Sequence, residues 1–310
     1  MKLRLVLISL LVLATTGIAQ TPDAISRMDG WVSWTVPLAE GVRICCNGCS
    51  VSSQGFTTNI NDDGPPERFD MLVAVKIAGG RIVNARGFQS ECRGTIKGAT
   101  VRHLTGVSVD ASLDFLAAHL HDRSDASKML ALIAQHDSPR IPGLLLRFAR
   151  RGEEEDVRKD AVFWLGQRGG EEGYRYLRDL VRNSGESQSL RERAVFSMSQ
   201  SKAGDTQELI DIARNHENRR IRREAIFWLG QKAGEKAASE LRRAVDDDPD
   251  EDVREHAVFA ISQLPKERGV PILIDLARNH KSPAVRKKAI FWLVQSGDDR
   301  ALGLVEEILR

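Results

Sequence analysis

Hydrophobic and polar residues along the C-terminal half of the chain follow the period of an amphipathic helix, and the pattern repeats. The segment at residues 161–167 (AVFWLGQ) returns at residues 225–231 (AIFWLGQ) and 289–295 (AIFWLVQ). Looser copies begin at Ala194 and Ala257, so the interval is about 32 residues. Self-similarity at a fixed interval in this range is typical of solenoids built from stacked supersecondary units.

Each repeating unit contains two helical patterns. Val157, Ala161 and Leu165 lie at i, i+4 and i+8, which is one face of a helix. A second apolar run follows a short polar turn, and the run at residues 209–216 (LIDIARNH) recurs as LIDLARNH at residues 273–280. Neither helix can bury its apolar stripe alone, so we predict antiparallel hairpins stacked around one continuous core.

A longer period is superimposed on the shorter one. Phe-Trp-Leu recurs at residues 163, 227 and 291, an offset of 64 residues, and the Leu-Ile-Asp run has the same offset. Alternate units are therefore more alike than neighbouring units. We predict three duplicated double units, in which odd and even units present different side chains.

Residues 157–166 carry a recognisable pattern, Val-Arg-x-x-Ala-x-x-x-Leu-Gly, which recurs in five units. In this pattern the chain resembles the HEAT-repeat family, specifically the short bacterial HEAT-like repeats also found in phycobilisome lyase subunits. The resemblance covers about residues 124–310. It implies an α-solenoid but no particular activity, because the fold serves many functions.

The expected fold is therefore mainly α: an α-solenoid of about six HEAT-like helical hairpins, preceded by a small β-containing cysteine domain. The hairpins are expected at about residues 124–152, 155–185, 187–217, 219–248, 250–281 and 282–310.

Residues 20–110 lack the repeat and are rich in Gly, Ser, Asn and Thr. Strand-forming residues fill 69–77 and 81–88 on either side of a Gly-Gly turn signal, so we predict a β-hairpin in a small β-rich domain. A loop is expected at residues 53–67.

Residues 111–123 are expected to form a capping helix and linker. The helix should run from Ala111 to His121 with Asp110 or Ser112 as its N-cap. We expect it to cover the first repeat, because the exposed end of a solenoid needs a cap.

Residues 1–19 have the features of a secretory signal peptide: basic Lys2 and Arg4, an apolar run over residues 5–14, and small residues before Gln20. The apolar run is short for a membrane span. We expect an exported protein, periplasmic or extracellular, without stable membrane insertion. An uncleaved anchor helix is the alternative.

All four cysteines, Cys45, Cys46, Cys49 and Cys92, lie in the N-terminal domain. In an exported chain an even number of cysteines favours disulfides, with Cys92 bonded to one of the other three. The alternatives are a thiolate metal site, since Cys46-x-x-Cys49 has zinc-knuckle spacing and His103 is nearby, and a redox motif.

The charge balance bears on the kind of partner. Removal of the signal peptide takes away two basic residues and no acidic ones, which leaves 43 of each sign. A nucleic-acid binder would have a net basic field. We therefore expect a protein partner and no nucleic acid.

A column of phenylalanines recurs in the first helix of the units and points away from the centre of the core stripe. It is expected either to pack between successive units or to offer an apolar stripe to a partner, whereas the neighbouring tryptophans are expected to be structural. Its members are Phe163, Phe196, Phe227, Phe259 and Phe291.

In this family the second helices usually line the concave face, so the charged residues of these helices are candidate partner contacts. Their mixed signs favour specificity by charge pattern. They are Arg175, Arg178, Asp179, Arg182, Asp211, Arg214, Arg242, Arg243, Asp275 and Arg278.

A column of arginines also belongs to the repeat, and it is expected to serve the repeat itself. Asp156 and Asp252 are the acids expected to pair with it. The column consists of Arg158, Arg191, Arg222, Arg254 and Arg286.

No catalytic motif is found, and no cofactor is expected. Deoxyhypusine hydroxylase, a HEAT-like enzyme, binds iron through His-Glu pairs just before the repeat's alanine. Those positions here hold no His-Glu pair. His216 and His280 lie two units apart, near 20 Å at about 10 Å per helix layer, and are too far apart to share a metal.

Overall fold

The computed structural model describes residues 22–40, 42, 69–90, 100–120, 125–151, 154–232 and 234–308. The expected signal peptide, the loop at 53–67 and all four cysteines lie outside these residues. The chain divides into two compact units, Met1–Ser138 (unit 1) and Pro139–Arg310 (unit 2).

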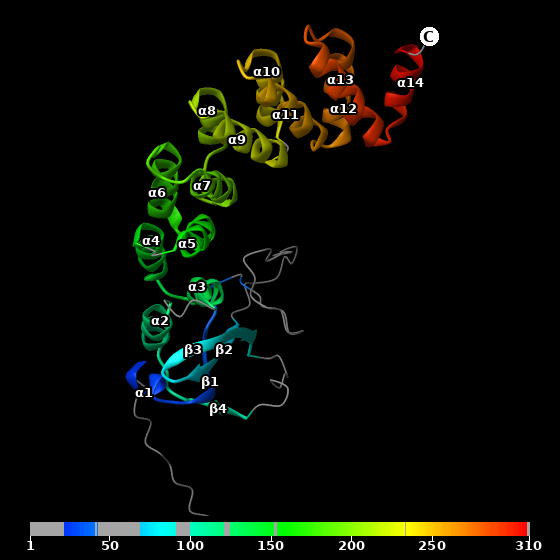
Figure 1. Cartoon of the computed structure of the whole chain (residues 1–310). Coiled ribbons are helices and arrows are strands. Elements are labelled where there is room, and N and C mark those ends of the chain that lie inside the picture. Colours follow the sequence, from blue (N-terminus) through cyan, green and yellow to red (C-terminus); the bar gives the residue numbers. More distant parts are fainter. Residues whose placement is uncertain are drawn as a thin grey trace, which may run out of the picture. The chain divides into compact units, whose positions relative to one another are not determined.

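Unit 1 contains a four-stranded sheet in the order β3-β2-β1-β4 (Figure 1). The predicted hairpin is confirmed: β2 and β3 are antiparallel, and Gly79 and Gly80 between them have φ values of 58° and 75°. Both glycines thus take the positive φ that a two-residue hairpin turn of this type requires. The strands are β1 (Gly30–Pro37), β2 (Asp70–Ala78), β3 (Arg81–Gln89) and β4 (Val101–His103).

Strand β1 is one of the two inner strands of the sheet, antiparallel to β2 and parallel to β4. Its alternate residues Val32, Trp34 and Val36 are buried, and Val75 and Val73 lie opposite the first two in register. Period-two burial of this kind makes one face of a sheet apolar. The helices of unit 1 are α1 (Pro22–Ser26), α2 (Val109–Ala118) and α3 (Ala126–Gln135).

Helix α2 starts two residues earlier than expected, and neither Asp110 nor Ser112 is its N-cap. The hydroxyl of Ser108 accepts a hydrogen bond from the backbone N–H of Ala111 at 3.1 Å, which is the standard N-cap interaction. Ser112 is instead completely buried against Trp34 of β1.

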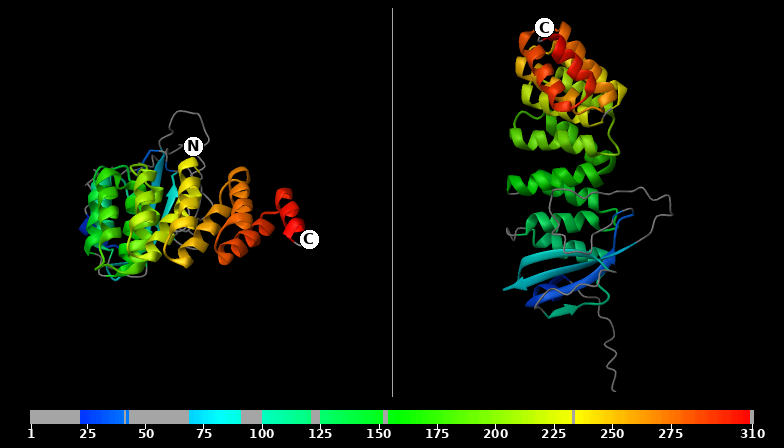
Figure 2. Two further views of the ribbon diagram at one scale, coloured as in Figure 1. Left: turned by 90° about the horizontal axis from the view of Figure 1, so that it is seen from above. Right: turned by 90° about the vertical axis from the view of Figure 1, so that its right-hand side faces the viewer.

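Unit 2 consists of helices that alternate in sequence between two layers and stack in chain order (Figures 1 and 2). The helices from α5 to α14 follow one another as the five hairpins expected at residues 155–310, whereas in the hairpin expected at residues 124–152 the first helix belongs to unit 1 and the second, α4, to unit 2. Their bounds are α4 (Ile141–Arg151), α5 (Glu155–Arg168), α6 (Gly170–Arg182), α7 (Gln188–Gln200), α8 (Thr206–Asn215), α9 (Arg219–Lys232), α10 (Glu235–Asp247), α11 (Glu251–Ser262), α12 (Lys266–Asn279), α13 (Pro283–Ser296) and α14 (Asp299–Ile308).

Within unit 2 the odd-numbered helices α5 to α13 form the layer on the inner side of the bend, and the even-numbered helices α4 to α14 form the outer layer (Figure 1). We call these the inner layer and the outer layer. The expectation that the second helices line the concave face is therefore wrong for this chain, since the second helices of the hairpins are the even-numbered ones.

Close backbone packing accounts for the direction of the bend. A Cβ atom built at Gly166 of α5 would overlap the backbone oxygen of Ser197 on α7, and one at Gly230 of α9 would lie 2.9 Å from the backbone oxygen of Ala260 on α11. Glycine lets these inner helices touch through their backbones. Because small residues bring the inner layer together, the array curves towards it.

The arginine column satisfies carbonyl groups at the ends of the outer helices. Arg191 donates through Nε to the carbonyl of Val181 at 2.9 Å, and Arg286 donates to that of His280 at 2.8 Å. These carbonyls have no partner within their own helices. The structural role is as expected, but the acids are not Asp156 and Asp252: Arg158 pairs with Glu186, and Arg222 pairs with Asp248.

Candidate functional site

Eight aromatic side chains form one continuous run across the inner layer of unit 2, which we call the aromatic ladder. Consecutive ring centroids are separated by 4.5 to 6.1 Å, within the range of favourable aromatic pairs. The order is Trp164, Phe163, Phe196, Trp228, Phe227, Phe259, Trp292 and Phe291.

The 64-residue period builds this ladder. Helices α5, α9 and α13 each contribute adjacent Phe and Trp rings in an edge-on contact, while α7 and α11 contribute one Phe each. At the position of the tryptophan, α7 has Ser197 and α11 has Ala260. Gly166 and Gly230 pack against these two small residues. The alternation of tryptophan with a small residue therefore determines both where the helices touch and the order of the rings.

Exposure of the rings rises along the array. Phe163 and Trp164 are buried, at 9% and 6% exposed. Phe196 and Phe259 are half-buried, and Phe291 on α13 is 51% exposed. The phenylalanines therefore do pack between successive units, and most of the ladder still presents ring surface to solvent. Contact with a partner stays a prediction.

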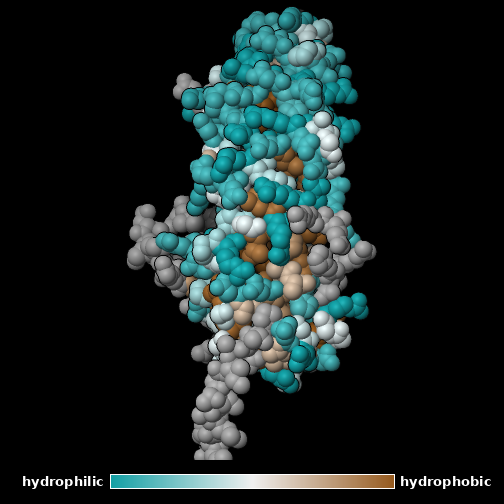
Figure 3. Space-filling model, turned by 90° about the vertical axis from the view of Figure 1, so that its left-hand side faces the viewer, coloured by the Kyte–Doolittle hydropathy of each residue, from teal (hydrophilic) through white to brown (hydrophobic). Residues whose placement is uncertain are grey.

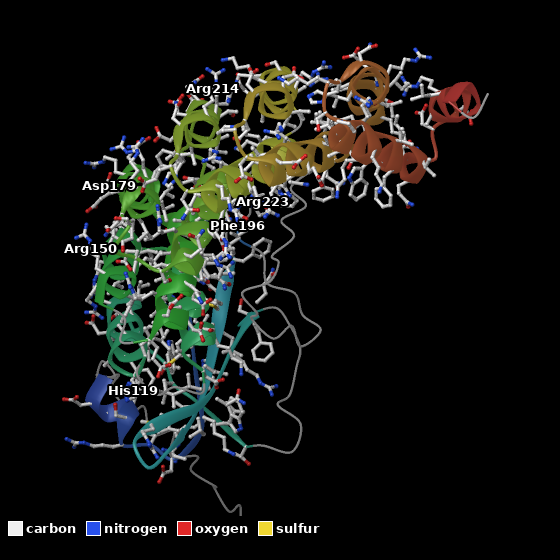
Figure 4. The ribbon with its side chains drawn as sticks, turned by 45° about the horizontal axis from the view of Figure 1, so that its top comes forward. His119, Arg150, Asp179, Phe196, Arg214 and Arg223 are labelled. Atoms are coloured by element: carbon white, nitrogen blue, oxygen red, sulfur yellow. The ribbon has the colours of Figure 1, made fainter. Side chains whose placement is uncertain are left out.

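The charged candidates of the second helices lie on the outer layer. Figure 4 shows Asp179 and Arg214 on the outer side of unit 2, whereas Phe196 and Arg223 lie on the inner side. The upper part of Figure 3, which looks onto outer helices of unit 2, is predominantly hydrophilic. Hydrophobic residues show there mainly in the seams between helices.

Many of these charged residues pair with the next outer helix. Arg182 of α6 contacts Glu208 of α8 at 2.5 Å. Arg214 of α8 binds Glu240 of α10, with its Nε at 2.7 Å, and this hydrogen bond lowers the pKa of the Glu240 carboxyl.

The same pairing continues along the outer layer. Arg242 of α10 forms an ion pair with Asp275 of α12, and Arg243 contacts Glu240 within α10 at 3.1 Å. Exposed pairs of this kind contribute little stability each. Their regular spacing nevertheless ties each unit to the next, so much of the predicted charge pattern is used within the array.

A pocket of about 500 Å³ opens on the inner layer beside the ladder. It is lined by Arg223 of α9, by residues of α11 that include His256 and Phe259, and by Lys288 and Trp292 of α13. Burial, followed by the nearby charges of Arg223 and Lys288, lowers the pKa of His256 to about 4, so this imidazole is neutral at pH 7.

Unit 1 contains a buried Ser-His pair. The Trp34 indole donates to the Ser112 hydroxyl at 2.7 Å, and that hydroxyl lies 2.8 Å from Nε2 of His136. Nδ1 of His136 lies 2.7 Å from the Leu132 carbonyl, which can only accept, so Nδ1 carries the proton and Nε2 accepts from Ser112.

This Ser-His pair is not arranged for catalysis. Ser112 and His136 are both 0% exposed, so no substrate reaches the hydroxyl. Burial lowers the pKa of His136 to about 4, which keeps the ring neutral. The three side chains instead satisfy one another's hydrogen bonds between β1, α2 and the end of α3.

Metal ligands are not brought together in the described part of the chain, which contains no group of three or more His, Cys, Asp or Glu residues placed to hold a metal ion. His216 lies 3.2 Å from the Val181 carbonyl, and His280 lies 3.6 Å from Asp246, so each histidine contacts the preceding repeat and not the other histidine. Among the same described residues, no helix has the length and hydropathy needed to cross a bilayer.

Comparison with known families identifies the repeats. Residues 206–290 and 245–310 match a family model described as HEAT repeats. The match confirms the predicted repeat type for this part of the chain. No curated protein matches the sequence. The closer similarity to phycobilisome lyase repeats stays a prediction.

Several solved structures resemble the chain weakly. Human deoxyhypusine hydroxylase in complex with glycerol is 17% identical over 63% of this chain and 77% of its own, with a TM-score of 0.29. A designed armadillo repeat protein is 19% identical over 54% and 87%, also with a TM-score of 0.29. A lipovitellin structure is 12% identical over 75% and 31%, with a TM-score of 0.44. Similarity at this level carries no argument about function.

Proposed function

We propose that the chain is an exported protein-interaction module or scaffold that binds a partner protein along the inner layer of unit 2. HEAT repeats commonly mediate protein interactions. The observation that carries the proposal is the aromatic ladder, whose rings from Phe196 to Phe291 are partly or largely exposed. Aromatic residues are enriched at protein interfaces, and a continuous exposed apolar surface commonly marks one.

The outer layer is the less suitable surface for the main contact. Arg182, Arg214 and Arg242 are each held by an acid of the next outer helix, so a partner would have to displace an existing ion pair. We assign these residues a role in holding successive units together. The remaining charges of the outer layer can add specificity to binding but not its main energy.

Export rests on the signal-like residues 1–19, and absence of nucleic-acid binding rests on the balanced charge. The alternative function, a metal- or thiol-dependent enzyme or sensor, depends on Cys45, Cys46, Cys49 and Cys92, which lie outside the described residues. Thiol titration with and without reductant, together with metal analysis, separates the two: thiolates holding a metal support the alternative, and two oxidised pairs support the interaction module.

A single substitution at the exposed end of the ladder tests the proposal. Phe291→Ser removes a ring that is 51% exposed, so folding should be little affected. Because truncated interface aromatics typically cost 1 kcal/mol or more, we expect about tenfold less partner captured from the exporting compartment. Asp179→Ser, on the outer layer, is the matched control and should capture as much partner protein as the wild type does. Loss with Asp179→Ser and retention with Phe291→Ser would contradict the proposal.

A further inference from the structure

One of the differences between the pocket beside the aromatic ladder and its counterpart one double unit earlier is the residue one helical turn before the tryptophan. In the earlier double unit, the indole of Trp228 donates to the carboxylate of Glu224, one helical turn before it, at 2.7 Å. In the later one, Trp292 has Lys288 at the equivalent position. A lysine ammonium has no acceptor, so it cannot replace the glutamate.

The consequence is an unsatisfied donor. Within the described residues, the Nε1–H of Trp292 is buried and has no hydrogen-bond partner. The Nε–H of Arg223, on the other side of the same pocket, is also buried without a partner. Buried donors in proteins nearly always have partners, so two such groups lining one pocket indicate that something else supplies the acceptor.

The charges around the pocket define the kind of acceptor. Arg223 and Lys288 are the cations of its wall, and His256 is neutral because of its lowered pKa. Two acids, Asp252 and Glu255, also line it, but each has a cation within 3.6 Å: Arg219 for Asp252 and Lys288 for Glu255. The two carboxylates repel a singly charged acceptor less than a phosphate dianion, so a monoanion is the more suitable acceptor for the two donors.

We propose that this pocket binds a carboxylate group, which accepts hydrogen bonds from Trp292 and Arg223 and is flanked by the rings of Phe259 and Trp292. The inference deepens the proposed function and rests on it for the source of the carboxylate, an acidic side chain of the partner lying along the inner layer. A small aromatic carboxylate has the same chemistry and is the other source that the test distinguishes.

The test follows the indole Nε1–H resonance of Trp292 by NMR in the full chain, assigned with Trp292→Phe. The probes are phenylacetate, its neutral analogue phenylacetamide, inorganic phosphate, and the capped peptides acetyl-Ala-Glu-Phe-amide and acetyl-Ala-Gln-Phe-amide. We expect phenylacetate and the Glu peptide to shift the resonance saturably, with dissociation constants on the order of 1 mM. The neutral analogues, phenylacetamide and the Gln peptide, should cause no shift. Tighter binding of the Glu peptide assigns the carboxylate to a protein, and tighter binding of phenylacetate assigns it to a small molecule.

Two variants make the result specific. Lys288→Glu restores the internal acceptor that Glu224 supplies to Trp228, so it should weaken binding at least tenfold while the chain stays folded. Lys287→Glu makes the same charge change at a neighbouring exposed position and should bind as the wild type does.

Several outcomes would overturn the carboxylate site: no shift with either carboxylate probe, equal shifts with the neutral probes, stronger binding of inorganic phosphate, or full binding by Lys288→Glu. Its failure is distinguishable from failure of the proposed function. If a partner protein is captured in a way that depends on Phe291 but no carboxylate probe shifts the Trp292 resonance, only the carboxylate site is contradicted. If the carboxylate probes bind but no partner protein is captured, the carboxylate site is supported and the scaffold role is contradicted.

Discussion

Replacing Asp248 with alanine should destabilise unit 2 by about 3–5 kcal/mol, because it leaves a buried arginine without its counter-ion. Arg222 and Asp248 are 8% and 7% exposed and form a bidentate pair, with N–O distances of 2.9 and 3.0 Å. Arg222 also donates to the His216 carbonyl at 2.9 Å, so the guanidinium cannot move out to water without breaking the end of α8. Thermal unfolding followed by circular dichroism should show a decrease of about 10 °C.

Two control variants distinguish the loss of stability caused by a buried unpaired charge from the loss caused by breaking an exposed ion pair. Arg214→Ala breaks a pair between α8 and α10 in which Arg214 is 39% exposed, and it should cost far less stability than Asp248→Ala because solvent screens the pair. The double variant Arg222→Met/Asp248→Ala removes both buried charges and should recover most of the lost stability. Equal losses for Asp248→Ala and Arg214→Ala would contradict the assignment of Arg222–Asp248 as the buried, structurally important pair.

The second large effect is expected at Gly166, where alanine should lower stability by about 1–3 kcal/mol although it is the better helix former. A Cβ atom there would overlap the backbone oxygen of Ser197 and lie 2.9 Å from the carbonyl carbon and Cα of that residue. Backbone atoms of a packed helix cannot rotate away as a side-chain end can. Helices α5 and α7 would therefore have to separate, which denaturant unfolding would detect.

Gly143 of α4 is the matched control, because a Cβ atom there meets nothing within 4 Å. Gly143→Ala should leave stability unchanged or raise it by up to about 1 kcal/mol. The stability of Gly230→Ala should lie between those of Gly166→Ala and Gly143→Ala, since the atom nearest to the added Cβ, the Ala260 oxygen, is at 2.9 Å. If Gly166→Ala were as stable as Gly143→Ala, close backbone contact would not be what sets the spacing of the inner layer.

The repeat pattern alone predicted most of unit 2. Because each unit shows two apolar stripes separated by a polar turn, the hairpins and their approximate bounds follow from the 32-residue period. The hairpin of β2 and β3 followed from the Gly-Gly turn for the same kind of local reason. Patterns that depend on neighbours in the chain are thus readable from the sequence.

Features that depend on tertiary packing were missed. Strand β1 contains Trp31, Val32 and Trp34, which have high strand propensity, but its antiparallel partner β2 begins only at Asp70, more than 30 residues after β1 ends. The N-cap of α2 was misassigned because Ser112 turned out to be required by Trp34 and His136, which are distant in sequence.

The two layers were also assigned incorrectly, although signals for both were present in the sequence. Gly166 and Gly230 recur at the 64-residue offset opposite small residues, which marks the layer where helices touch. The pairs Arg182–Glu208 and Arg214–Glu240 share a separation of 26 residues, which joins the last turn of one outer helix to the first or second turn of the next. The change from Glu224 to Lys288 is likewise visible as a break in the period.

The most direct test of the central claim is site-specific photo-cross-linking on the two layers of unit 2. The photoreactive residue p-benzoylphenylalanine replaces Phe196 or Phe259 on the inner layer, and Asp179 or Asp211 on the outer layer, in full chains that keep residues 1–19. We expect the inner positions to form a discrete covalent adduct with one partner protein and the outer positions to form none. Adducts from the outer positions alone, or from neither layer, would contradict the claim.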